Sequence, residues 1–197
     1  MQIKAQGLFN AAKWIEAEYG QAALRDVLRA CSPAVRELYT SAIVINWHDV
    51  EEFIEFLEVS EKMLGKGDGK FAELVGAAGA RENLRGAMSR AALYLANPEF
   101  LMKRVASLWS QFNDEGAMTI NKFVADEMIL EVKGVSKPHW LHCCTITGWA
   151  SEVSAQFGWR APSAKHVRCR ARGEARCLWD IHGTLPDEPS SRRNSRV

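Results

Sequence analysis

The sequence predicts an α+β domain: several amino-terminal helices packed beside a small antiparallel sheet of about four strands, with a long helix preceding the last hairpin. Two observations predict this class. Apolar residues recur at helical spacing through the first two-thirds of the chain, whereas after Gly116 they alternate with polar residues. With 197 residues, 47% of them hydrophobic, the chain is long enough to bury one core. We expect residues 1–183 to form a single domain.

The first helix is expected around an apolar face that runs from Leu8 to Tyr19 and ends at Gly20. A second, shorter helix is expected over residues 22–30, because Ser32-Pro33 follows it directly. Both assignments rest on periodicity and on the residues that stop helices. They place two consecutive helices at the amino terminus.

The third helix is expected to begin at a cap, Asn46 or Asp49, and to carry an apolar stripe over residues 50–64. The glycine-rich residues 65–69 then interrupt the chain. They lack the Gly-Lys-Ser/Thr ending of a phosphate-binding loop and have no preceding strand, so we interpret them as an ordinary loop. A fourth helical stretch is expected over residues 71–95.

Asn97-Pro98 is a strong helix-start signal, and the helix that it opens should end before Gly116. Beyond that point the period of the apolar residues changes to two. Strands are expected around residues 118–120 and 128–132, joined near Ala125-Asp126.

The carboxy-terminal part is expected to hold a helix from Pro138 to Gly158 and a hairpin of strands 166–172 and 175–182. The Pro-, Ser- and Arg-rich residues 184–197 are expected to be a disordered tail.

The hairpin's register follows from its alternation, because the apolar residues of both strands must face one core. A turn at residues 172–174 meets this condition. It places Cys169 opposite Cys177 and Val167 opposite Trp179.

The other face of this hairpin would pair His166 with Asp180 and Arg170 with Arg176. Two like charges directly opposite each other are unfavourable. Either an anion lies nearby, from an acidic side chain or a ligand phosphate, or both arginines extend into water. Arg170 and Arg176 are therefore candidate ligand-binding residues.

Two facing cysteines have three interpretations: small buried apolar side chains, half of a metal site, or a redox-active pair. A metal site would need further ligands, and the candidates are Cys143 and Cys144 in the segment that begins at His139. Thiolates and imidazoles suit zinc, although the spacing is not a CxxC…CxxC pattern. The candidate metal ligands are thus Cys169, Cys177, Cys144 and Cys143.

The segment from Gly148 to Ile181 resembles the 4-vinyl reductase domain, which is related in fold to the Bet3-like TRAPP subunits. The matching residues are Gly148, Glu152, Phe157-Gly158 and the Cys-x-x-x-Gly-x-x-x-Cys stretch of residues 169–177. Gly7-Leu8-Phe9 and Tyr19-Gly20 are similar to the start of uncharacterised paralogous bacterial proteins of this architecture. The resemblance implies a homodimer formed through helices, an apolar cavity and a regulatory role.

Amino-terminal helices of this style also occur in haem-dependent nitric oxide sensors. Those proteins need a proximal histidine and a Tyr-x-Ser-x-Arg motif for the haem propionates, and this chain has no such motif. His48, beside Trp47, is the histidine that would ligate iron, but we interpret it as an exposed residue at a helix start. On this ground haem is set aside, and zinc is kept as the cofactor to consider.

The expected function is that of a non-enzymatic sensor of a small apolar molecule in bacterial signalling, with Trp109, Trp149 and Trp179 as candidate lining residues. The alternative is a dimeric adaptor module without a ligand, which recruits an unknown protein partner. An enzyme would need a catalytic constellation, and the nearest set, His142, Cys143 and Asp180, does not supply one. No catalytic residue is assigned.

Composition and sequence pattern argue against nucleic acid binding, a membrane-spanning helix and secretion. The net charge of +1 gives no global reason to expect nucleic acid binding. No apolar run approaches the roughly 18 residues of a membrane-spanning helix. The amino terminus lacks the profile of a signal peptide, and the five cysteines, an odd number, are more typical of a reducing cytoplasm than of a disulfide-bonded protein.

Overall fold

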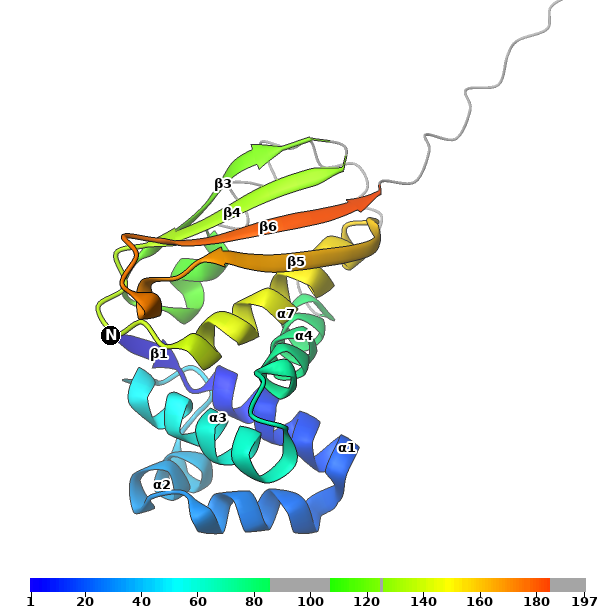
Figure 1. The fold of residues 1–197 in the computed structure, drawn as a ribbon. Coiled ribbons are helices and arrows are strands. Elements are labelled where there is room, and N and C mark those ends of the chain that lie inside the picture. The colour runs from blue at the N-terminus through cyan, green and yellow to red at the C-terminus, as the bar shows by residue number, and fades with distance from the viewer. Residues whose placement is uncertain (86–106, 125, 185–197) are drawn as a thin grey trace, which may run out of the picture.

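The computed structural model describes residues 1–85, 107–124 and 126–184, and it confirms the predicted α+β class. A four-stranded antiparallel sheet forms one side of the molecule and the helices lie on the other (Figure 1). The expected helix start at Asn97-Pro98, the strand joint at Ala125 and residues 185–197 of the expected tail lie outside the described residues. Thr184, assigned to that tail, is the last residue of a strand.

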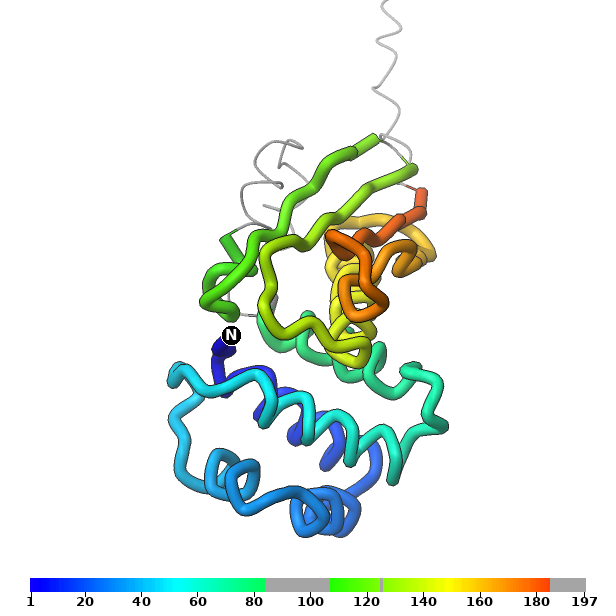
Figure 2. Tube along the Cα trace, turned by 60° about the vertical axis from the view of Figure 1, so that its left-hand side comes forward, coloured from blue at the N-terminus to red at the C-terminus, as the bar shows by residue number. Residues whose placement is uncertain are grey.

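The helical part consists of α1 (Gln6–Ala30), α2 (Pro33–Ser41), α3 (Val50–Leu64) and α4 (Lys70–Arg85), with the short antiparallel strands β1 (Gln2–Lys4) and β2 (Trp47–Asp49) beside them. The second part consists of β3 (Ala117–Phe123), β4 (Glu127–Lys133), α7 (Trp140–Gln156), β5 (Arg160–Arg168), the 3₁₀ turn η1 (Arg170–Arg172) and β6 (Cys177–Thr184). Both views place α4 and α7 between the sheet and helices α1–α3 (Figure 1 and Figure 2). No helix within the described ranges is long and apolar enough to cross a membrane.

Element α1 comprises two helical stretches that meet at Gly20, where the backbone is not helical, so the expected end of the first helix is confirmed. Gly20 has a φ of +86°, a conformation that a residue with a Cβ rarely adopts, so the glycine interrupts the helix. Helix α2 was not predicted, although its start carries a plain signal. The Ser32 hydroxyl accepts the Val35 N–H, and Pro33 occupies the first helical turn.

The glycine-rich residues 65–69 form a loop whose amides are occupied by the protein's own carboxylate. Glu61, which is buried, accepts hydrogen bonds from the N–H groups of Gly67 (3.1 Å), Gly69 (3.2 Å) and Ala72 (3.2 Å). These are the donors that a phosphate would use in a phosphate-binding loop. The loop therefore closes α3 onto the first turn of α4.

Replacing Glu61 with alanine is expected to lower the free energy of unfolding by about 3 kcal/mol, because it leaves buried N–H groups without an acceptor. Urea denaturation measures the effect. Glu58→Ala is the matched control on the same helix, since Glu58 is exposed and, among the described residues, forms an ion pair only with His139 at 3.3 Å. Equal midpoints for the two variants would mean that the loop amides do not depend on Glu61.

The large sheet has the strand order β3-β4-β6-β5, and every neighbouring pair is antiparallel. Arg168 pairs with Leu178, as the predicted register of the last hairpin requires. A bulge between His166 and Arg168 then shifts the pairing by one residue, so that His166 pairs with Trp179 and Lys165 with Asp180. The bulge turns Val167 outward, where 53% of its surface is exposed, and turns His166 toward the core.

Helix α7 covers the inner face of the sheet, where Leu130, Trp179 and Ile181 are fully buried. The indole N–H of Trp179 donates to the Thr147 hydroxyl of α7 (2.9 Å), which joins the sheet to this helix. On its other side α7 crosses α4 at very short range. A Cβ added to Gly148 would lie 1.7 Å from the Glu73 carbonyl oxygen, so only glycine permits this crossing.

Candidate functional site

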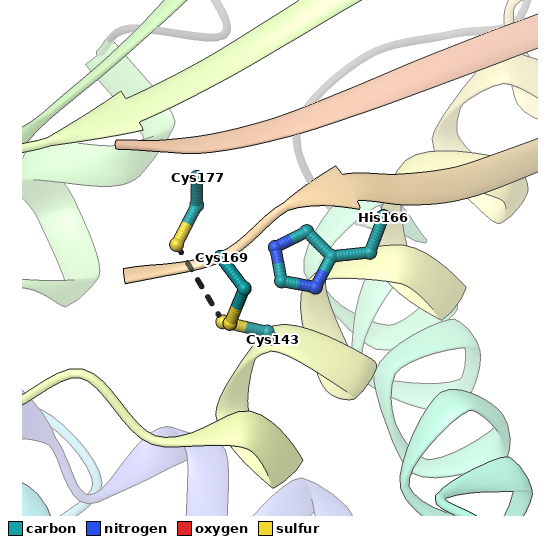
Figure 3. A group of neighbouring side chains, drawn as sticks. All are labelled: Cys143, His166, Cys169 and Cys177. Atoms are coloured by element: carbon teal, nitrogen blue, oxygen red, sulfur yellow. Dashed lines mark hydrogen bonds between the residues drawn. The ribbon is translucent and has the colours of Figure 1, made fainter. Parts of the chain in front are cut away.

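Three cysteines and one histidine meet where α7 touches the end of the last hairpin. Cys143 comes from α7, His166 from β5, Cys169 from the turn after β5, and Cys177 from the start of β6 (Figure 3). Their ligand atoms all lie within 4.8 Å of one another. The three cysteines are buried and His166 is half-buried.

The local backbone explains why these four side chains converge. The bulge turns His166 inward, and the 3₁₀ turn then folds the chain back so that Cys169 and Cys177 face the same point. The Arg170 N–H donates to the Cys177 sulfur at 3.3 Å, and the Cys169 N–H donates to a Glu174 carboxylate oxygen at 2.8 Å. The turn thus fixes both cysteines through backbone hydrogen bonds.

The electrostatics of the cluster favour a thiolate at Cys177. Hydrogen bonds from the Cys143 thiol, His166 and the Arg170 N–H lower the pKa of Cys177. The same Cys143–Cys177 hydrogen bond, together with burial, raises the pKa of Cys143.

The separation of two sulfurs in the cluster equals that of two zinc ligands. Two sulfurs bound to one zinc at about 2.3 Å lie about 3.8 Å apart. The Cys143 and Cys177 sulfurs are 3.8 Å apart. His166 stacks on Trp179 with ring centroids 4.4 Å apart, and its buried Nε2 has no hydrogen-bond partner among the described residues. A metal ion would satisfy this nitrogen, because Cys₃His is a standard zinc donor set.

Three of the four expected metal ligands come together, and the fourth does not. Cys144 lies on another side of α7, where a Cβ added to Gly69 would approach its sulfur to 2.7 Å. His166 was missed because the predicted register placed it on the outer face. Its spacing of three residues from Cys169 was the signal that could have identified it.

A cavity of about 140 Å³ lies where the helical part, α7 and strand β3 meet. It is lined by Ile3, Lys4, Gln6, Gly7, Asn10, Phe53, Val75, Gly76, Gly79, Asn83, Leu108, Trp109, Phe112, Asn113, Met118, His142, Thr145, Ile146 and Trp149. Most of this surface is apolar. Its polar edge is a chain of amides, in which Gln6 donates to Asn10 (2.8 Å) and Asn10 donates to Asn83 (3.2 Å).

His142 presents its imidazole to this cavity. The ring meets Phe53 edge-on, with centroids 6.2 Å apart, and lies nearly parallel to Trp109 at 6.4 Å. Burial lowers the pKa of His142 to about 4, so the ring is neutral at pH 7. No described residue makes a hydrogen bond to the ring.

The other expected ligand-binding residues have different positions. Trp109 and Trp149 line the cavity, whereas Trp179 is packed against His166 beside the cysteine cluster. The predicted pairing of Arg170 with Arg176 is wrong, because Arg170 lies in the 3₁₀ turn and donates to the Ala175 carbonyl (3.5 Å). The Arg176 guanidinium lies 3.6 Å from the Glu131 carboxylate. The anion expected beside this arginine is therefore an acidic side chain.

The fold is shared with solved structures of one kind. An H-NOX protein from S. oneidensis in the Fe(II)NO ligation state aligns with a TM-score of 0.64 at 12% identity, over 92% of this chain and 99% of that chain. The chain has the H-NOX fold. Unliganded Fe(II) H-NOX from K. algicida aligns with a TM-score of 0.60 at 9% identity, over 94% of this chain and 99% of that one.

A third structure, the H-NOX from Shewanella woodyi in the Fe(II)CO ligation state, has a TM-score of 0.59 at 15% identity, over 96% of this chain and 97% of its own. Comparison with protein-family models and with curated protein sequences finds no match. These alignments overturn the resemblance to the 4-vinyl reductase and Bet3-like TRAPP domains. That resemblance depended on a short hairpin pattern, and the alignments cover nearly the whole chain.

The exclusion of haem is also corrected, because it rested on a missing motif and not on the fold. The H-NOX neighbours are described in Fe(II) ligation states, and one is described through its haem redox potential. His48 is not the exposed residue expected: it is buried in β2, and its Nδ1 lies 2.9 Å from Glu52. Among the described histidines, His142 is the one that lines the apolar cavity.

Proposed function

We propose that this chain is a non-enzymatic small-molecule sensor domain that holds a haem in the cavity between its helical part and α7. The observation that carries the proposal is the cavity itself. It is walled by aromatic and aliphatic side chains and contains one imidazole without a hydrogen bond from the described residues. A mostly apolar wall with one polar nitrogen donor is typical of a small-molecule site.

A bound haem would supply an iron that takes a diatomic ligand such as NO or CO, the ligation states described for the solved H-NOX proteins. The protein's own residues would do the rest. Phe53, Trp109 and Ile146 would exclude water from the iron.

A sensor role agrees with the expectation that the chain is not an enzyme. The solved H-NOX structures are described by ligation state and by the mechanism of H-NOX activation, not by a catalysed reaction. The apolar ligand expected from the sequence would then be the porphyrin of the haem. The sensed molecule would be the gas that the iron binds.

Within this proposal the Cys₃His cluster holds a structural zinc ion. The four ligands come from α7 and from both arms of the last hairpin, so one ion would fasten the sheet to the helix that lines the cavity. Bonds of this kind contribute directly to folding. The zinc would keep His142, the neighbour of Cys143, in a fixed position.

One observation favours the second candidate, a dimeric adaptor. Ile43 (63% exposed) and Ile45 (68% exposed) form an apolar loop that ends at the half-exposed Trp47. Exposed apolar groups of this size are typical of protein contact sites. A homodimer through this loop would be compatible with the sensor role.

Anaerobic titration of the purified protein with ferrous haem tests the proposal. We expect saturation at one haem per chain and a shift of the Soret band when CO or NO is added. Gly79→Phe is the matched control, because a Cβ at Gly79 meets nothing within 4 Å and its ring would fill the cavity. Equal haem binding by this folded variant, or no saturable binding by the parent, would contradict the proposal.

A further inference from the structure

We propose that the outer side of the last hairpin is a docking surface for an acidic surface of a partner protein. Four side chains define it: Lys165 and Arg168 of β5, Arg172 of η1, and Arg176 immediately before β6. We call this group the basic hairpin surface. The inference requires neither a ligand in the cavity nor a metal in the cysteine cluster.

The charge of the hairpin differs from that of the whole chain. The chain has 25 Lys and Arg residues against 24 Asp and Glu residues, whereas residues 160–184 have six against two. All four members of the basic hairpin surface are exposed. A local excess of one sign on a nearly neutral protein attracts a surface of the opposite sign and speeds the encounter with it.

Strand pairing places the two β5 cations on the outer face of the sheet. Lys165 pairs with Asp180, and Arg168 pairs with Leu178. These two β6 residues alternate with Trp179, which is fully buried and bonded to α7, so they and their partners point away from that helix. Strand β5 is at the edge of the sheet, and η1 continues the surface beyond its end (Figure 1).

Three of the four cations have no partner in the described part of the chain. The side chains of Lys165, Arg168 and Arg172 form no hydrogen bond or ion pair with another described residue. The acidic groups beside them are already engaged, because Glu174 accepts a backbone N–H (2.8 Å) and Asp180 pairs with a histidine of its own strand (2.9 Å). The surface therefore presents positive charge that the described residues do not neutralise.

A groove at the turn end of the hairpin indicates a protein partner and not a polyphosphate. Its lining combines three cations with two carboxylates: Glu131, Lys133, Arg168, Glu174, Ala175 and Arg176. A row of phosphates would bring negative charge against both carboxylates, whereas a folded protein can oppose each charge with its opposite. Residues 160–184 also expose no Phe, Tyr or Trp ring on which a nucleic acid base could stack.

A second copy of this chain does not fit the basic hairpin surface. In a two-fold contact the same patch faces itself, which would bring Lys165 and Arg168 against like charges. Strand pairing along the edge of β5 is restricted as well, because Pro162 has no N–H and the Ala164 N–H donates to the Ser151 hydroxyl (3.2 Å). A partner would therefore bind through the side chains.

The chain's own tail and an anionic membrane are also poor matches. Residues 185–197 have three arginines and two acidic residues, so the tail adds positive charge to the surface. A membrane-binding surface inserts apolar groups, and Val167 (53% exposed) is the only large apolar side chain that residues 160–184 expose. The charge pattern thus favours a partner protein with an acidic surface.

Fluorescence anisotropy of a labelled peptide of alternating glutamate and serine, titrated with the full chain, tests the proposal. The hairpin variant is Lys165→Glu/Arg168→Glu. The matched control is Arg25→Glu/Lys66→Glu, which makes the same change in charge at two exposed cations of the helical part. We expect the parent and the control to bind the peptide equally and the hairpin variant to bind it at least about tenfold more weakly, because like charges then face each other. Added salt should weaken the binding.

Five results would overturn the proposal. The parent would not bind the peptide, or the control would lose as much affinity as the hairpin variant, which would mean that only net charge matters. Tighter binding of duplex DNA or phosphatidylserine vesicles than of the peptide, lost in the hairpin variant, would assign the surface to a nucleic acid or a membrane. A parent dimer that dissociates in this variant would assign it to a second copy, and tighter peptide binding after removal of residues 185–197 would assign it to the tail.

Circular dichroism and thermal melting establish that both variants are folded. The hairpin variant should bind haem as the parent does, because neither substituted residue lines the cavity. Loss of peptide binding with haem binding retained is thus the expected result. The docking surface and the proposed sensor function can therefore fail independently of each other.

Discussion

Cys177→Ser is expected to release the metal from the Cys₃His cluster and to lower the melting temperature by about 10 °C. Structural zinc sites contribute up to about 10–16 kcal/mol of apparent binding free energy. If only about 3–5 kcal/mol of this binding free energy adds to the stability of the fold, loss of the zinc should lower the melting temperature of a chain of this size by about 10 °C. The effect is large because Cys177 begins β6, the strand that pairs with both β4 and β5. Zinc content by elemental analysis and a thermal scan measure the two outcomes.

Cys144→Ser is the matched control for this substitution. Cys144 is next to Cys143 on α7 but lies outside the cluster, so its replacement should leave one zinc per chain and a nearly unchanged melting temperature. Loss of zinc in Cys144→Ser, with zinc retained in Cys177→Ser, would restore the ligand set in which Cys144 binds the metal. No zinc in the parent protein would rule out a structural zinc site altogether.

Gly148→Ala is expected to lower the free energy of unfolding by about 3 kcal/mol, the upper end of the range for overpacked sites. The added Cβ would lie 1.7 Å from the carbonyl oxygen of Glu73, and backbone cannot move aside as a side chain can. Gly76→Ala should act in the same way from the opposite helix, since its Cβ would lie 1.9 Å from the Thr145 carbonyl oxygen. Urea denaturation measures both.

The control for this crossing is Gly79→Ala. Gly79 lies on α4, three residues beyond Gly76, and a Cβ there meets nothing within 4 Å. Alanine stabilises a helix by about 0.5–1 kcal/mol relative to glycine, so this variant should be slightly more stable than the parent. A stable Gly148→Ala protein would mean that α4 and α7 can separate without loss, and the cavity that they line would not have a fixed shape.

The sequence predicted the α+β class because periodicity is a local property. Helical spacing identifies α1 and α3, and the period-two alternation of Met128, Leu130 and Val132 identifies β4, whose three residues face the core. The interruption at Gly20 was predicted, because glycine stops helices. The strands β1 and β2 were missed, because three residues are too few to define a period.

In the carboxy-terminal hairpin, the alternation of apolar and polar residues led to a wrong prediction. Either Val167 or His166 can face the core in an alternating strand, and the apolar residue was the natural choice. The bulge reverses that choice, and a bulge has no signature in the side-chain pattern when no glycine marks it. The inward His166 is stabilised by stacking on Trp179, a contact that no sequence pattern shows. The error in register concealed one ligand of the cluster.

The cavity could not be predicted because its wall is assembled from distant segments. Its lining comes from β1, α1, α3, α4, β3 and α7, and the role of His142 emerges only when those elements meet. The exclusion of haem failed for a related reason, because it relied on the absence of a sequence motif and not on the fold. The aligned H-NOX structures share the fold of this chain at only 9–15% sequence identity.

Native mass spectrometry of the protein, produced with added zinc and haem precursor, tests the central claim most directly. The native species should carry one zinc ion and one haem per chain, and acid denaturation should release both. A folded native species that contains zinc but never haem, even at saturating haem, would contradict the claim. The H-NOX fold would then serve this chain without the cofactor of its structural neighbours.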